Sequence, residues 1–137
     1  MNPVFNKVSI GTWITLGHPA IPEIFASSGF DWLAIDLEHS AITLGEAEEL
    51  IRVIDLKNVI PLVRLSSNNA EQIKRVMDAG AHGVIVPMVN NADQAAQAVA
   101  AVKYPPVGQR SVGLARHPGL SIQLGEALSS AAIASAS

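Results

Sequence analysis

The chain has 137 residues, of which 49% are hydrophobic and 15% are charged, with a formal net charge of −3 and no cysteine. This length fits one domain of ordinary size, and this composition excludes an intrinsically disordered chain and a disulfide scaffold. Because the sequence has no Lys/Arg cluster, no apolar run near the ~20 residues of a membrane span and no signal-peptide pattern in residues 1–7, we expect a cytoplasmic protein without nucleic-acid or membrane partners.

Short β-type runs alternate with helical runs along most of the chain. The predicted strands cover residues 8–15, 31–37, 59–65 and 83–88. The predicted helices cover residues 19–28, 44–56, 69–79 and 92–102. Thr43 and Glu46 have the spacing of a capping box, which predicts where the second helix begins. Pro61 argues against a central position for the third strand, although it lies near the strand start, where proline is tolerated.

This order predicts four β/α units around a parallel sheet. Residues 27–35 and 78–86 even resemble each other, since in both a helix ends at glycine shortly before a buried strand. Two architectures remain open, an open doubly wound sheet and a (β/α)8 barrel. A barrel typically uses ~250 residues, so four units make roughly half of one. Beyond residue 107 the pattern breaks, and the glycine-containing segment 108–113 is a weak phosphate-binding signal.

The candidate functional residues follow the strands, because parallel α/β folds bind ligands at the carboxyl ends of their strands. Asp36, Glu38 and His39 follow the second strand, where they favour proton transfer over a merely solvated polar cluster. Arg64 ends the third strand and fits either a carboxylate ligand or an ion pair with Asp36. Asp78, near the end of the third helix, reads from its position alone as a surface residue.

Several motifs resemble one family in register from about Gly11 to Arg116. They are GFDWLAIDLEH at 29–39, PLVR at 61–64, IKRVMDAGA at 73–81, VPMVNNA at 86–92 and YPPVGQRSVG at 104–113. Together they resemble the HpcH/HpaI family of 2-oxo-acid aldolases. The resemblance implies a TIM-type (β/α)8 barrel and a metal-dependent carbon–carbon lyase that cleaves 4-hydroxy-2-oxo acids to pyruvate and an aldehyde.

The resemblance also implies a role for each matching residue. His39 corresponds to the catalytic histidine that manages the aldol proton through water, and Asp78 to the acid paired with it. Arg64 corresponds to the arginine that binds the oxo acid and neutralises the developing enolate charge. Asp36 and Glu38 correspond to acidic residues of the metal–water network. The implied cofactor is a divalent metal (Mg, Mn or Co), the implied small-molecule partner is a 2-oxo acid such as pyruvate, and the implied assembly is a homo-oligomer.

The chain departs from the family in its last part. The family's direct metal ligands come from the second half of the barrel, and this chain has no counterpart to them. We therefore expect residues 1–117 to form an N-terminal (β/α)4 half of the barrel and residues 118–137 to be a divergent Ala/Ser-rich tail, helical or disordered. Two alternatives remain: a catalytically inactive half-barrel that self-associates or pairs with a partner half, and an unrelated open-sheet protein that binds an anion at segment 108–113.

Overall fold

Four β/α units build the computed structural model, which describes residues 8–111. One parallel sheet has the order β1-β2-β3-β4, formed by β1 (Gly11–Ile14), β2 (Trp32–Asp36), β3 (Ile60–Arg64) and β4 (Gly83–Ile85). Each strand is followed by a helix: α1 (Ala20–Ala26), α2 (Leu44–Leu56), α3 (Ala70–Asp78) and α4 (Ala92–Val102). The predicted α/β class and parallel sheet are confirmed.

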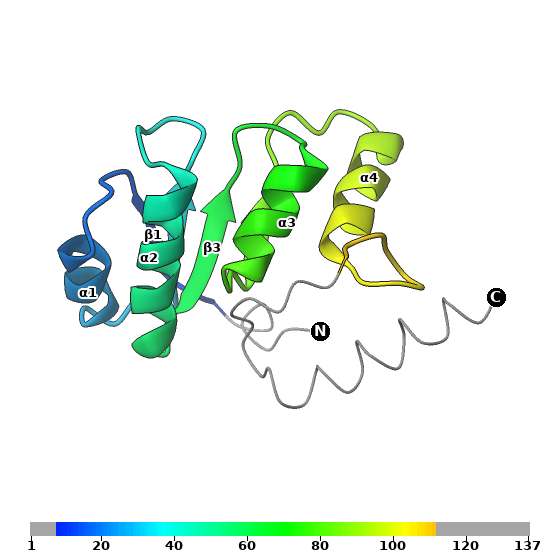
Figure 1. The fold of residues 1–137 in the computed structure, drawn as a ribbon. Helices are drawn as coiled ribbons and strands as arrows, with labels where there is room; N and C mark the ends of the chain where they lie inside the picture. The colour runs from blue at the N-terminus through cyan, green and yellow to red at the C-terminus, as the bar shows by residue number, and fades with distance from the viewer. Residues whose placement is uncertain (1–7, 112–137) are drawn as a thin grey trace.

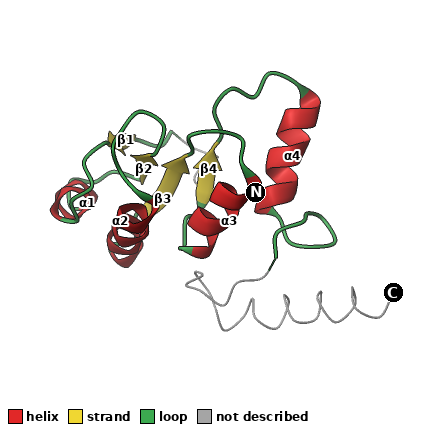
Figure 2. Cartoon of the chain, turned by 45° about the horizontal axis from the view of Figure 1, so that its top comes forward, coloured by secondary structure: helices red, strands yellow, loops and turns green. Residues whose placement is uncertain are grey.

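The four helices lie on one side of the sheet, as Figures 1 and 2 show. A doubly wound sheet carries helices on both faces and reverses its strand order, whereas a barrel wall keeps sequential order with all helices outside. The core lies between the sheet and the helices, where Ile35 and Val63 pack with Leu50 and Ile73. Its leading members are at most 1% exposed. The arrangement is therefore part of a TIM-type barrel wall.

The opposite face of the sheet, here called the inner face, carries the alternate residues of each strand. Strand register places Trp13 beside Ala34 and Leu62, and it places Asp36 beside Arg64 and Ile85. Among the described residues no helix covers this face, so Trp13 is 42% exposed and Leu62 is half-buried. The inner face is apolar along its middle and charged only at the carboxyl ends of the strands.

All four strands are shorter than predicted, and the first and fourth differ most. The first begins at Gly11 instead of residue 8, and Val8 and Ile10 before it are 91% and 63% exposed. The fourth ends at Ile85 instead of residue 88. Pro87 has no N–H for a strand ladder, and Met88 has φ +55°, a left-handed conformation that no strand adopts. Both predicted runs therefore included apolar residues that continue past the paired part of the strand.

Pro61 lies in a central strand, contrary to the expectation drawn from its missing N–H. Its carbonyl accepts a hydrogen bond from the His82 N–H at 2.9 Å, so Pro61 turns its backbone groups toward β4. Paired residues of β4 begin only at Gly83, opposite Leu62. The missing donor therefore falls just before the ladder between β3 and β4 begins.

The start of α2 is as predicted. The Glu46 N–H donates to Oγ1 of Thr43, and the Glu46 carboxylate accepts from the Thr43 N–H at 2.7 Å. This capping box satisfies backbone donors that a helix start leaves free. The Thr43 N–H and the Thr43 hydroxyl both donate to the Glu46 carboxylate, and these two hydrogen bonds lower the pKa of Glu46.

Candidate functional site

A buried ion pair joins the last residues of β2 and β3. Asp36 and Arg64 are register partners, so both side chains leave the inner face at the carboxyl ends of their strands. Arg64 donates from Nε to Oδ1 of Asp36 at 2.9 Å and from Nη2 to Oδ2 at 2.5 Å. The Asp36 side chain is 3% exposed and that of Arg64 is 25% exposed. This two-point geometry is the strong form of an arginine–carboxylate pair.

The ion pair shifts the pKa of both partners. Hydrogen bonding from Arg64 is the main reason why the pKa of Asp36 falls to about 2, although burial alone would raise it. The same contact raises the pKa of Arg64. Asp36 is therefore a carboxylate and Arg64 a guanidinium throughout the neutral range, and neither serves as a proton carrier there.

The loop after β2 folds around Asp36. Oδ1 of Asp36 also accepts the backbone N–H of Glu38 at 2.9 Å and that of His39 at 3.1 Å. The Ser40 hydroxyl donates to the backbone carbonyl of Asp36. These bonds form a turn of the Asx type, in which an aspartate side chain replaces a backbone acceptor. Asp36 thus fixes both the guanidinium and the loop that carries Glu38 and His39.

Glu38 and His39 extend the cluster toward solvent. Oε2 of Glu38 lies 3.5 Å from Nε of Arg64, and Oε1 of Glu38 lies 3.7 Å from Nε2 of His39. The His39 side chain is 69% exposed, whereas that of Glu38 is 20% exposed. His39 is therefore the titratable group of this cluster that water and a small ligand reach most easily. Of the five predicted site residues, four meet here.

Trp13 belongs to this cluster, although the sequence did not single it out. The Arg64 guanidinium lies over the Trp13 ring, 4.6 Å from its centroid. Such a cation–π contact restrains the guanidinium while leaving its edge free for hydrogen bonds. The signal in the sequence was alternation, since Trp13 occupies the same face of β1 that Asp36 and Arg64 occupy on their strands.

Asp78 does not join the cluster. It is the last residue of α3, a nine-residue helix that begins just after the loop leaving Arg64. Such a helix is ~13.5 Å long, so Asp78 lies toward the opposite end of the sheet. Its Oδ1 lies 3.8 Å from Nη1 of Arg110. The expected convergence of His39, Arg64 and Asp78 at one mouth is therefore found for the first two only.

The described residues do not form a metal site. No group of three or more His, Asp or Glu side chains in the range 8–111 could hold an ion. Both Asp36 oxygens already accept hydrogen bonds from Arg64. Glu38 is the other carboxylate of the cluster, and it lies 3.5 Å from Nε of Arg64. The donors present do not fit a divalent ion on their own. Within the same range, no helix is long and apolar enough to cross a membrane.

Comparison with known proteins gives a family match. The sequence model described as HpcH/HpaI aldolase/citrate lyase matches residues 9–136. This match includes residues 118–136, where we expected the resemblance to end. The boundary at residue 117 and the structure of the tail lie outside the described residues and stay predictions.

The relatives include two curated aldolases and one solved structure. The 4-hydroxy-2-oxo-heptane-1,7-dioate aldolase of Salmonella dublin is 43% identical over 109 residues, 80% of this chain and 41% of that protein. The 4-hydroxy-2-oxovalerate aldolase of Novosphingobium aromaticivorans is 44% identical over 110 residues, 80% of this chain and 42% of that protein. An HpcH/HpaI aldolase/citrate lyase family protein from Burkholderia cenocepacia J2315 superposes with a TM-score of 0.78 at 28% identity, covering 90% of this chain and 51% of that one. The chain thus spans about two-fifths of the length of these curated relatives.

Proposed function

This chain belongs to the HpcH/HpaI aldolase/citrate lyase family. We propose that it acts as a carbon–carbon lyase that cleaves 4-hydroxy-2-oxo acids to pyruvate and an aldehyde. The observation that carries the proposal is the two-point Arg64–Asp36 pair at the strand ends, with His39 exposed beside it. Two of the relatives are a 4-hydroxy-2-oxo-heptane-1,7-dioate aldolase and a 4-hydroxy-2-oxovalerate aldolase, which supports this substrate class.

Arg64 is the proposed binding group for the oxo acid. Asp36 occupies Nε and Nη2, and no described residue bonds to Nη1. A guanidinium fixed in this way offers its remaining N–H groups to a carboxylate or enolate without losing further side-chain freedom. Asp36 holds Arg64 in place, and Glu38 lies beside it with Oε2 3.5 Å from Nε.

His39 is the proposed proton carrier. Cleavage removes the proton of the C4 hydroxyl, the C3–C4 bond breaks, and its electron pair forms the pyruvate enolate while the aldehyde leaves. The enolate then takes a proton at C3 to give pyruvate. An exposed imidazole next to Glu38 is suited to accept and return that proton, through water as the family resemblance implies.

The divalent metal that the resemblance implies would chelate the oxo acid and stabilise the enolate. The described residues do not hold it, so no step is assigned to it here. Asp78, which the resemblance pairs with His39, lies away from this cluster and takes no part in the steps above.

Exchange of the pyruvate methyl protons in heavy water tests the proposal, because enolate formation does not depend on the identity of the aldehyde. We expect NMR to show exchange with added Mg²⁺ or Mn²⁺, and loss of exchange in Arg64→Met. Arg52→Met is the matched control, since Arg52 pairs with Glu48 on the exposed side of α2. A folded protein without exchange, or exchange that Arg64→Met leaves unchanged, would contradict the proposal.

A second candidate is a catalytically inactive half-barrel that pairs with a second copy or with a partner half. Two observations favour it. Within the described residues, β1 and β4 each pair on one side only. The inner face is also incompletely buried, and open strand edges promote association. Sedimentation at several protein concentrations distinguishes a monomer from an associating chain.

A further inference from the structure

Asp36 fixes one edge of the Arg64 guanidinium but leaves its plane free to turn. The hydrogen bonds from Nε and Nη2 end on the two oxygens of one carboxylate, so both lie along the same edge of the guanidinium. Rotation about that edge changes the direction of Nη1 while both bonds stay nearly the same length. That direction decides whether a ligand carboxylate meets two N–H groups of Arg64 or only one.

Trp13 restricts this remaining rotation. The central carbon of the Arg64 guanidinium lies 4.6 Å from the centroid of the Trp13 ring. A ring against the face of the guanidinium blocks rotation about the edge that Asp36 binds, and the attraction between the cation and the ring favours the same orientation. Trp13 is 42% exposed, so the ring also borders the solvent from which a ligand reaches Nη1.

The contact between Trp13 and Arg64 crosses β2, because the two residues belong to β1 and β3. Neighbouring strands lie about 4.8 Å apart, so the two side chains meet above the strand between them. Ala34 is the register partner of Trp13 on that strand and belongs to the same inner face. It is 0% exposed although no helix among the described residues covers this face, so neighbouring side chains cover it. The small side chain of Ala34 leaves the space that the contact needs.

We infer that Trp13 is a positioning residue for Arg64, and that Ala34 provides the space in which the ring and the guanidinium meet. In this orientation Nη1 and the second N–H of Nη2 face the carboxylate of the oxo acid together. The inference rests on the proposed function, because it concerns the same binding group. Trp13 forms no bond with the substrate, and its contribution is to prearrange Arg64, which lowers the entropic cost of binding.

The NMR resonance of the Arg64 Nε–H tests the contact without reference to catalysis. An indole ring shifts a proton near its face upfield, so we expect this resonance to move downfield in Trp13→Leu and to a smaller extent in Trp13→Phe. Ala34→Val keeps both partners and should act in the same direction, because the added methyl groups occupy the space between them. Circular dichroism shows whether each variant is folded. An Nε–H resonance that Trp13→Leu leaves unchanged would overturn the inference.

Pyruvate binding tests the consequence for the site. Titration with pyruvate in the presence of Mg²⁺, followed through the Arg64 Nε–H resonance, gives the dissociation constant. We expect it to rise about three- to tenfold in Trp13→Leu and about twofold in Trp13→Phe, the range of a cation–π contact at a partly exposed site. In methyl-proton exchange the loss should appear mainly in KM, because Trp13 touches no reacting atom.

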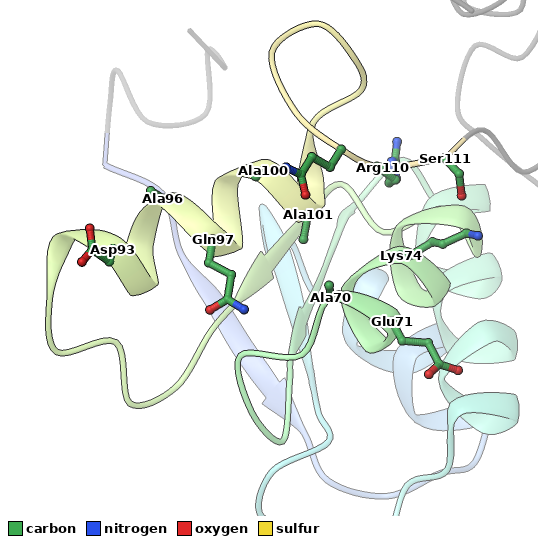
Figure 3. Close-up of a pocket in the computed structure, with 11 residues that line it drawn as sticks. Ala70, Glu71, Lys74, Asp93, Ala96, Gln97, Ala100, Ala101, Arg110 and Ser111 are labelled. Carbon is green, nitrogen blue, oxygen red and sulfur yellow. The ribbon is translucent and has the colours of Figure 1, made fainter.

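Two controls separate this site from other positions. Trp32 is the second tryptophan of the chain and lies at the start of β2, beside Gly11, so Trp32→Phe should leave the dissociation constant of pyruvate unchanged. Lys74 lines a cavity of about 670 Å³ between α3 and α4, which none of the cluster residues lines (Figure 3). Lys74→Met should also bind pyruvate normally. Binding weakened by Lys74→Met but not by Trp13→Leu would place pyruvate in that cavity and overturn the inference.

Failure of this inference and failure of the proposed function give different results. Pyruvate binding that depends on Trp13, without any methyl-proton exchange, would contradict the lyase and support the positioning role. Binding and exchange that Trp13→Leu leaves unchanged would contradict the positioning role and support the lyase. A folded chain that does not bind pyruvate at all would overturn both.

Discussion

Asp36 combines roles that usually fall to separate residues. One carboxylate accepts two hydrogen bonds from Arg64 and two from the backbone of the following loop. Charge-assisted bonds of this kind are stronger than neutral ones, and they set both the orientation of Arg64 and the path that brings His39 to the strand ends. Replacing Asp36 is therefore expected to affect binding and loop geometry together.

The pH dependence of stability reports this carboxylate directly. The pKa of Asp36 is about 2 in the folded protein against about 3.9 in an unfolded chain, so its contribution is present above pH 4 and is lost as the pH falls toward 2. At about 1.4 kcal/mol per pKa unit, this difference corresponds to about 2.6 kcal/mol. We expect Asp36→Asn to lower the free energy of unfolding by about that amount at pH 7.

Urea unfolding between pH 7 and pH 3 measures this effect. The difference between the two proteins should shrink steadily below pH 4. Glu48→Gln is the control, because Glu48 is exposed and its pair with Arg52 should give no such pH-dependent difference. A constant difference between Asp36→Asn and the unchanged protein at every pH would show that the loss is due to packing and not to charge.

At single positions, sequence reasoning was reliable where side-chain direction follows from strand alternation. It placed Asp36 and Arg64 at the same end of neighbouring strands, and one alternative it left open, an ion pair between them, is what the structure contains. It also placed Asp78 near the end of the third helix, where the structure has it. The pairing of Asp78 with His39 was implied only by the family resemblance, which carries no information on the distance between the two side chains. Sequence reasoning did not find Trp13, since a tryptophan in a strand is most often core.

At the level of elements, β1 depends on one close contact. Gly11 is the register partner of Trp32, and a Cβ at Gly11 would lie 2.0 Å from the Trp32 ring. The ring therefore occupies the place of the missing side chain. We expect Gly11→Ala to move the ring and to destabilise the protein by about 1–3 kcal/mol, the usual cost of overpacking.

Gly45 provides the matched comparison. It lies in the first turn of α2, and a Cβ there would meet nothing within 4 Å. Alanine should therefore stabilise the protein, by up to about 1 kcal/mol, because it reduces the freedom of the unfolded chain. Thermal unfolding of both variants measures the contrast. Equal effects of the two substitutions on thermal stability would show that the contact between Gly11 and the Trp32 ring does not restrict the side chain at position 11.

The order of elements and the α2 boundaries could be read from the sequence, because hydrophobic period and capping residues act locally. Strand ends could not. The apolar residues before Gly11 and after Ile85 look like strand, yet pairing stops where the neighbouring strand stops, and that limit is set by chain segments far away in sequence. The sequence also left open whether the sheet belongs to a barrel or to an open doubly wound fold. The position of all four helices on one face of the sheet (Figures 1 and 2) decides this in favour of the barrel.

For the whole molecule, the inner face decides how the chain behaves in solution. It is apolar in the middle, and no helix among the described residues covers it. If the chain associates through this face, Leu62→Glu should abolish the association, because Leu62 lies on that face at the centre of the sheet and a carboxylate there opposes burial.

Sedimentation of Leu62→Glu beside the unchanged protein measures this, with circular dichroism to confirm that the fold is retained. Val99→Glu is the control, since Val99 is 54% exposed on α4. An association that survives Leu62→Glu but not Val99→Glu would place the contact on the helical side.

Gly29 lies two residues after Ser27, the C-cap of α1, and Gly80 lies one residue after Ala79, the C-cap of α3, with φ angles of +85° and +107° that favour glycine. Each helix therefore stops through its own local sequence, a few residues before the next strand begins, without help from distant parts of the chain. A β/α unit bounded by such junctions contains the residues that end its own helix. Units of this kind can be duplicated, exchanged or joined during evolution without redesigning the connections between them, and the similarity of residues 27–35 to 78–86 is the trace that such duplication would leave.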